Sequence, residues 1–297
     1  MKAPVANMAK AIMVQGSASG VGKSVLTTAL CRIFTQDGYK TAPFKAQNMT
    51  TICHTLDDGR KMARSQAIAA YACKTEPEPD MNPVLLMMGG GGTEIFINGV
   101  SVGAMARHEY SEYKTHAFEH ILAAYNRLSE KNDVIVIEGA GSPVELNLNK
   151  NDIVNMGLAK AAAAPVLLVS DIMRGGVFAS LYGTLALLPE DEKQLVKGLV
   201  VNKFKGSIEH FSYGVSILEE ICKTPVLGVI PHIDVRLEDE DSLAEDEVKT
   251  KSSLEKSYNI SDYDEHMHSE FNRLATHFRT NLNMAKLYEV LMRQNDY

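Results

Sequence analysis

Residues 16–24 read Gly-Ser-Ala-Ser-Gly-Val-Gly-Lys-Ser, and this glycine-rich stretch limits the possible folds more than any other feature. It follows the apolar run 11–14, which is typical of a buried strand, and precedes the amphipathic stretch 25–34, which is typical of a helix. A strand, a glycine turn and a helix N-terminus form a cradle in which backbone N–H groups converge on a phosphate. The closing lysine would neutralise the β- and γ-phosphates, and the serine hydroxyl would reach Mg²⁺. The residues expected to hold a nucleotide are therefore Gly16, Ser17, Gly20, Val21, Gly22, Lys23, Ser24 and Val25.

Apolar, β-branched segments recur along the chain with helical stretches between them. They lie at residues 11–14, 134–137, 166–169, 198–201 and 226–230. This alternation predicts parallel strands joined by crossover helices. We therefore expect an α/β fold, a P-loop NTPase-like and mostly parallel sheet flanked by helices. A shorter segment at 95–99 predicts a hairpin or edge strand, after a flexible glycine loop at 89–92.

The composition changes near residue 234. Seven of the eleven residues in 237–247 are acidic, and residues 249–257 are polar, which predicts an exposed linker. Beyond it, apolar residues at helical spacing in 263–291 predict a helix or helix pair that packs on another surface. The expected organisation is a synthetase-like domain at 1–236, a linker at 237–260 and a C-terminal helical tail at 261–297.

The overall composition excludes several classes of protein. The chain has 297 residues, of which 45% are hydrophobic, and a formal net charge of −7, which argues against a general nucleic-acid binder. Its four cysteines are widely spaced, so neither a disulfide framework nor a zinc site is indicated. No apolar run approaches the roughly 20 residues of a membrane span. We expect a cytoplasmic protein with neither a membrane nor a nucleic acid as partner.

Several strings are more specific than the glycine loop. They are residues 43–49 (Pro-Phe-Lys-Ala-Gln-Asn-Met), 81–86 (Met-Asn-Pro-Val-Leu-Leu), 137–143 (Ile-Glu-Gly-Ala-Gly-Ser-Pro), 152–156 (Asp-Ile-Val-Asn-Met) and 174–180 (Arg-Gly-Gly-Val-Phe-Ala-Ser). Over roughly residues 11–243 the chain resembles the synthetase domain of the cobyric acid synthase family. The resemblance implies an ATP- and Mg²⁺-dependent ligase that activates corrinoid side-chain carboxylates as acyl phosphates for amidation by ammonia, in cobalamin biosynthesis.

The resemblance also implies what supplies the ammonia. The family's glutaminase half has no counterpart in this sequence, and residues 263–291 resemble the tail that follows it. Free ammonia or a separate glutaminase subunit would then be the donor. A homodimer is suggested by analogy with the superfamily.

The residues that match family motifs define the expected site. Lys23 and Lys45 are the expected catalytic cations, and Lys45 matches a family lysine close to the γ-phosphate. Ser24, Glu138 and Asp58 fit Mg²⁺, although the adjacent Asp57 leaves open which aspartate acts. Asn202 matches a position that reads adenine through its amide. The residues expected to grip the corrinoid are Gln47, Asn48, Gln66, Asn82, Glu145, Asn147, Asp152, Asn155 and Arg174.

Three positions depart from the family pattern. Lys61 stands where the family usually has Glu, Met87 where it has the Lys of a Lys-Pro pair, and Met173 where it has Asp. Loss of the cation at position 87 can remove about 3 kcal/mol of transition-state stabilisation. A catalytically degenerate protein that binds nucleotide and corrinoid therefore stays open as an alternative. A dethiobiotin-synthetase-like carboxylase is a further one.

Overall fold

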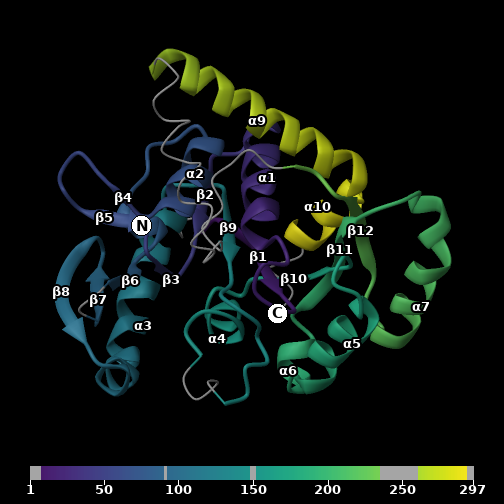
Figure 1. The fold of residues 1–297 in the computed structure, drawn as a ribbon, viewed down its shortest axis with the longest axis horizontal. Coiled ribbons are helices and arrows are strands. Elements are labelled where there is room, and N and C mark those ends of the chain that lie inside the picture. Colours follow the sequence, from purple (N-terminus) through teal and green to yellow (C-terminus); the bar gives the residue numbers. More distant parts are fainter. Residues whose placement is uncertain (1–7, 90–91, 148–151, 235–259, 293–297) are drawn as a thin grey trace, which may run out of the picture.

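The computed structural model describes residues 8–89, 92–147, 152–234 and 260–292 (Figure 1). Its centre is a six-stranded sheet in the order β12-β11-β10-β1-β9-β2, with every neighbouring pair parallel. The strands are β1 Lys10–Gly16, β2 Thr41–Phe44, β9 Val134–Glu138, β10 Val166–Asp171, β11 Val196–Phe204 and β12 Val226–Pro231. The predicted α/β fold class is confirmed, and each predicted strand is present.

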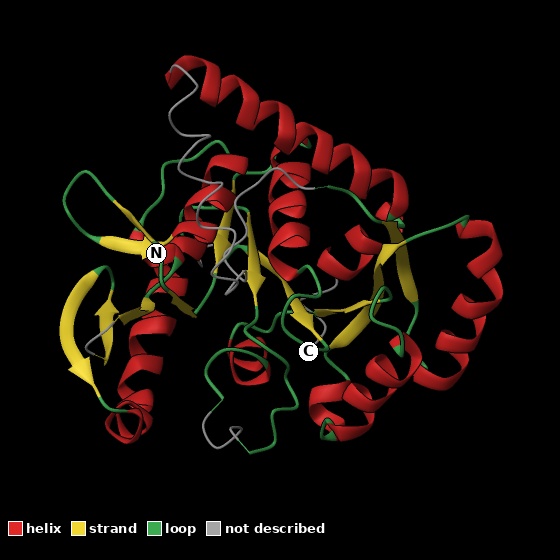
Figure 2. Ribbon diagram, viewed as in Figure 1, coloured by secondary structure: helices red, strands yellow, loops and turns green. Residues whose placement is uncertain are grey.

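Helices cover both faces of this sheet (Figure 2). They are α1 Lys23–Gln36, α2 Arg64–Ala72, α3 Arg107–Ser129, α4 Met156–Ala161, α5 Val177–Leu187, α6 Glu190–Lys193, α7 Ser212–Cys222, α9 Ile260–Asn281 and α10 Met284–Met292. Short 3-10 turns occur at Pro79–Met81 and Ile208–Phe211. None of the helices in the described ranges is long and apolar enough to cross a membrane.

The alternation of side chains along β1 assigns each helix to a face of the sheet. Ile12 and Val14 belong to a core that includes residues of α1, α9 and α10. Ala11 and Met13 point the other way, into a core that includes residues of α3, α4, α5 and α7. Because both faces are covered, β1 is apolar along most of its length.

The C-terminal helices confirm the predicted helix pair. Helix α9 packs against α1 at an oblique angle (Figure 1), and Arg32 Nε of α1 donates a hydrogen bond to Asn272 Oδ1 of α9 at 2.9 Å. Asn283 N–H donates to the Leu227 carbonyl of β12 at 2.7 Å, just before α10 begins. The predicted linker lies outside the described residues, except for Ile260 at the start of α9. The proposed domain boundaries stay predictions.

A second, smaller sheet stands beside the first. It has the order β3-β6-β7-β8, formed by Gln47–Thr50, Val84–Gly89, Gly92–Ile97 and Val100–Met105, and a separate hairpin pairs β4 (Cys53–Thr55) with β5 (Lys61–Ala63). The segment predicted as a hairpin or edge strand forms the second half of β7 and the turn to β8, and β7 pairs antiparallel with β6 and β8. The rest of this sheet was not predicted. Of the predicted glycine loop, Gly89 ends β6 and Gly92 begins β7, and residues 90–91 lie outside the described residues.

Candidate nucleotide and acyl-phosphate site

The glycine loop begins where β1 ends at the carboxyl edge of the sheet. Ser17 N–H donates to the Val169 carbonyl at 2.9 Å, which fixes the start of the turn against β10. Gly20 and Gly22 have φ of 71° and 98°, a region that favours glycine, and Gly22 immediately precedes α1. The loop thus leads directly into a helix N-terminus, the geometry that binds phosphate.

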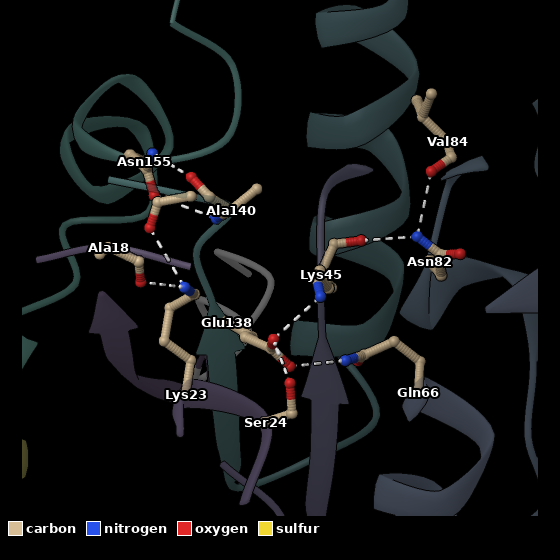
Figure 3. Close-up of polar contacts among 11 residues, drawn as sticks. Ala18, Lys23, Ser24, Lys45, Gln66, Asn82, Val84, Glu138, Ala140 and Asn155 are labelled. Atoms are coloured by element: carbon tan, nitrogen blue, oxygen red, sulfur yellow. Dashed lines mark hydrogen bonds and ion pairs between the residues drawn. The ribbon is translucent and has the colours of Figure 1, made fainter. Parts of the chain in front are cut away.

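Lys23 is the first residue of α1, and its side chain reaches back to the glycine loop. It is 5% exposed. Its Nζ donates to the Ala18 carbonyl at 3.0 Å and to the Gly141 carbonyl at 3.1 Å (Figure 3). The first carbonyl belongs to the glycine loop and the second to the loop after β9. The ammonium therefore ties the two loops together at the place where phosphates would bind.

Glu138 is the centre of a second cluster, at the carboxyl end of β9. Its Oε1 accepts hydrogen bonds from Ser24 Oγ at 2.7 Å and Lys45 Nζ at 2.9 Å, and its Oε2 accepts one from Gln66 Nε2 at 3.2 Å (Figure 3). Only 2% of the Glu138 residue is exposed. A buried carboxylate requires such partners, because an unpaired charge away from water is strongly unfavourable. The predicted residues Ser24, Lys45 and Glu138 are brought together.

Ser24 and Glu138 suit Mg²⁺ in their chemistry. Their side-chain oxygens are hard donors within 2.7 Å of each other, beside the phosphate loop. Within the ranges that the structure describes, no three His, Cys, Asp or Glu side chains gather as a metal site. Oxygens of the nucleotide and water would therefore have to complete the coordination of a magnesium ion held here.

Asp58, the third predicted magnesium ligand, has contacts with a different part of the protein. It occupies the turn between β4 and β5, where it is exposed and paired with Arg60 at 2.7 Å. Hydrogen bonds from Arg60 hold the pKa of the Asp58 carboxyl below its usual range. The structure brings Ser24 and Glu138 together without showing a contact from Asp58, so its metal role stays a prediction.

Several residues expected to grip a corrinoid make hydrogen bonds to the backbone around the site in this structure. Asn82 is fully buried, accepts from Ala63 N–H at 2.9 Å, and donates to the carbonyls of Lys45 at 3.0 Å and Val84 at 3.1 Å. Asn155 binds both the N–H and the carbonyl of Ala140, at 3.1 and 2.7 Å (Figure 3).

Asp152 and Gln66 also contact other parts of the protein. Asp152 accepts from the N–H groups of Val154, Asn155 and Gly157, before and within the start of α4. Gln66 donates to Glu138. These contacts make Asn82, Asn155, Asp152 and Gln66 supports of the site in this conformation.

The other predicted substrate residues divide by exposure. Gln47 accepts a hydrogen bond from the Tyr110 hydroxyl, and Asn48 is buried in β3. Glu145 and Asn147 are exposed after β9, and Arg174 is exposed after β10. These last three side chains are accessible to a large ligand.

The end of β11 contacts the glycine loop directly. Asn202 Nδ2 donates to the Val21 carbonyl at 2.9 Å, and Lys203 Nζ donates to the Gly20 carbonyl at 2.6 Å. The predicted contact of Asn202 with adenine stays a prediction, and Lys203 was not among the predicted site residues. Asp171, 3.2 Å from Lys203 Nζ, was missed as well. Both follow or end predicted strands, so the rule that ligands bind at the carboxyl ends of parallel strands was the available signal.

The three departures from the family pattern lie apart from the glycine loop in sequence. Met87 is partly buried on β6, against the cluster of Ala63, Leu85 and Phe96. Lys61 Nζ lies 5.2 Å from the centre of the Phe96 ring on the same cluster. Met173 is exposed after β10.

A parallel sheet with a glycine loop between β1 and α1, and with lysine, serine and glutamate side chains at its carboxyl edge, defines a P-loop nucleotide-binding protein. Comparison with known families narrows this class. The family described as "CbiA: CobQ/CobB/MinD/ParA nucleotide binding domain" matches residues 12–243, and the chain belongs to this family.

Two similar curated proteins are both named cobyric acid synthase. The cobyric acid synthase of Ruminiclostridium cellulolyticum is 51% identical over 239 residues, covering 80% of this chain and 46% of that protein. That of Dehalococcoides mccartyi strain CBDB1 is 50% identical over 244 residues, covering 82% and 48%. This chain thus spans about half the length of the curated relatives it matches. Among solved structures, the signal recognition particle receptor FtsY of Elizabethkingia anophelis with GDP is 18% identical, with a TM-score of 0.44, covering 81% of this chain and 64% of that one.

Proposed function

We propose that this chain is an ATP- and Mg²⁺-dependent amidoligase of the cobyric acid synthase type, acting on corrinoid side-chain carboxylates in cobalamin biosynthesis. The convergence of Lys23, Lys45, Ser24 and Glu138 at one edge of the sheet carries the proposal. The names of the relatives support the substrate class.

The reaction requires a carboxylate oxygen to become a leaving group. The corrinoid carboxylate attacks the γ-phosphorus of ATP, the bond from that phosphorus to the bridging oxygen breaks, and ADP leaves. Ammonia then attacks the acyl carbon of the acyl phosphate, inorganic phosphate leaves with the former carboxylate oxygen, and the nitrogen loses one proton to water, which leaves the amide. Little covalent work falls to the protein, so positioning and charge neutralisation dominate.

Residues of the glycine loop and of the segment after β2 share this work. Lys23 and the N–H groups of the glycine loop bind the phosphates and keep negative charge from accumulating there. Lys45, held against Glu138, places a second ammonium beside the first residues of α1. Magnesium, bound through Ser24 and Glu138, would supply further charge neutralisation on the phosphate oxygens. Free ammonia or a separate glutaminase subunit is the proposed nitrogen donor.

The direct experiment measures ADP formation from ATP and Mg²⁺ in the presence of cobyrinic acid diamide and ammonium. We expect a rate above the protein-free blank that needs both the corrinoid and ammonium, and a new amide detected by mass spectrometry. A rate equal to the blank contradicts the proposal. ATP binding without turnover in the same preparation would then favour the degenerate binding protein. Turnover with diaminopelargonic acid and bicarbonate instead would identify the carboxylase alternative.

A further inference from the structure

Two consecutive side chains at the end of β11 hold consecutive carbonyls of the glycine loop. Asn202 Nδ2 binds the Val21 carbonyl at 2.9 Å, and Lys203 Nζ binds the Gly20 carbonyl at 2.6 Å. Asp171 Oδ2, at the end of β10, lies 3.2 Å from Lys203 Nζ. The carboxylate therefore fixes the ammonium between the two neighbouring strands and the loop.

The backbone of β11 departs from regular strand geometry where this happens. Successive side chains of a regular strand point to opposite faces, so two neighbours would not both reach one loop. Lys203 has a φ of 58°, in the left-handed region that is unfavourable for lysine. The register with β12 also shifts between Val201 and Phe204. The irregularity brings Asn202 and Lys203 to the same loop.

Holding these carbonyls determines where the following N–H groups point. In a planar trans peptide, the carbonyl of one residue and the N–H of the next point in opposite directions. With the Gly20 and Val21 carbonyls turned toward β11, the N–H groups of Val21 and Gly22 must turn away from it. We propose that Lys203, together with Asn202, is a positioning residue that orients these two N–H groups toward the phosphates of the nucleotide.

The close fit around Gly22 supports this reading. A Cβ at Gly22 would lie 2.2 Å from Asn202 Nδ2. A side chain at position 22 and the hydrogen bond of Asn202 to the loop therefore exclude each other. Arg174 is a second cation near the loop, but its Nε lies 3.9 Å from Asp171 Oδ2 and its side chain is 72% exposed. Lys203 is therefore the cation held between the loop and Asp171.

The test uses Lys203→Gly, which removes the ammonium and also relieves the unfavourable backbone. We expect ATP–Mg²⁺ affinity, measured by isothermal titration calorimetry, to fall about tenfold, the effect of losing one charge-assisted hydrogen bond. The free energy of unfolding should fall, because the buried Asp171 carboxylate loses this partner and the relieved backbone offsets only part of that loss. Lys223→Gly is the matched control: Lys223 has a φ of 52° and is exposed at the end of α7, so this change relieves similar strain and should leave ATP affinity unchanged.

Adenosine separates orientation of the phosphate site from contact with the base. Lys203→Gly should reduce ATP affinity and leave adenosine affinity unchanged. An equal loss for both ligands, or wild-type ATP affinity, overturns the proposal. Should Lys203→Gly fail to fold, Lys203→Met keeps the aliphatic chain and loses the charge, and the same results apply to it. The proposal rests on the nucleotide half of the proposed function. Nucleotide affinity requires no amide formation, so a protein that binds ATP without turnover contradicts the proposed function alone.

Discussion

Replacing Lys45 with methionine removes a cation whose Nζ lies 2.9 Å from Glu138 Oε1, where the two side chains are only 8% and 2% exposed. The carboxylate would keep its hydrogen bonds from Ser24 and Gln66, which are both neutral. Breaking a buried ion pair from one side destabilises a protein by about 3–5 kcal/mol, because the remaining charge loses its compensation. We expect the free energy of unfolding of Lys45→Met, measured in urea, to fall by that amount.

Activity should respond differently from stability. Loss of one preorganised cation at the transferred phosphoryl group reduces kcat by roughly 10²- to 10³-fold. In the double variant Lys45→Met with Glu138→Gln, no charge is left unpaired, so most of the lost stability should return. Turnover should stay low, because neither the cation nor the carboxylate is restored.

Urea unfolding, monitored by circular dichroism, measures the free energy of unfolding. ADP release measures turnover on the same preparations. The two double-variant outcomes are independent of each other. If the double variant is no more stable than Lys45→Met alone, the ion pair is not what holds Glu138 in the folded protein. If its turnover returns with its stability, Lys45 acts only through folding and not on the phosphoryl group.

Three further predictions concern the tail, pH and the departure at position 87. Phe271→Ala should lower the free energy of unfolding in urea by about 3–5 kcal/mol, within a single transition, because Phe271 is fully buried. Burial, and then Arg64, lower the pKa of His54, so the unfolded chain takes up its proton first. Stability should therefore fall as pH drops below about 6.5, and a urea series from pH 7.5 to 5 should show a shallower slope for His54→Gln. Met87→Lys should increase ADP release with corrinoid and ammonium, and an unchanged rate would favour the degenerate binding protein.

The nucleotide half of the site could be predicted because its information is local. The glycine loop sets its own turn, and an apolar run on one side with an amphipathic stretch on the other fixes its place between strand and helix. Lys23 and Ser24 follow at fixed positions in that turn. Glu138 could be added because it ends a buried strand, where parallel strands bring their ends to one edge.

The second sheet was harder to predict for a physical reason. The segment that forms β3 is short and mixed in polarity, and its strand geometry depends on a partner distant in sequence. Gln47 in β3 pairs with Val84 in β6. The direction of the Lys203 side chain could not be predicted either, because it depends on an irregular register between β11 and β12.

A matching motif gives the position of a residue but not the direction of its side chain, and the asparagines show the consequence. Asn82 uses both amide donors and its carbonyl on backbone groups, and Asn155 does the same around the loop after β9. For either amide to contact a corrinoid, it would have to break these bonds and leave buried backbone groups unpaired, at roughly 1–3 kcal/mol for each group. Exposed polar side chains carry no such penalty. Of the nine residues first expected to bind substrate, Glu145, Asn147 and Arg174 are therefore the ones on which mutagenesis of corrinoid affinity should begin.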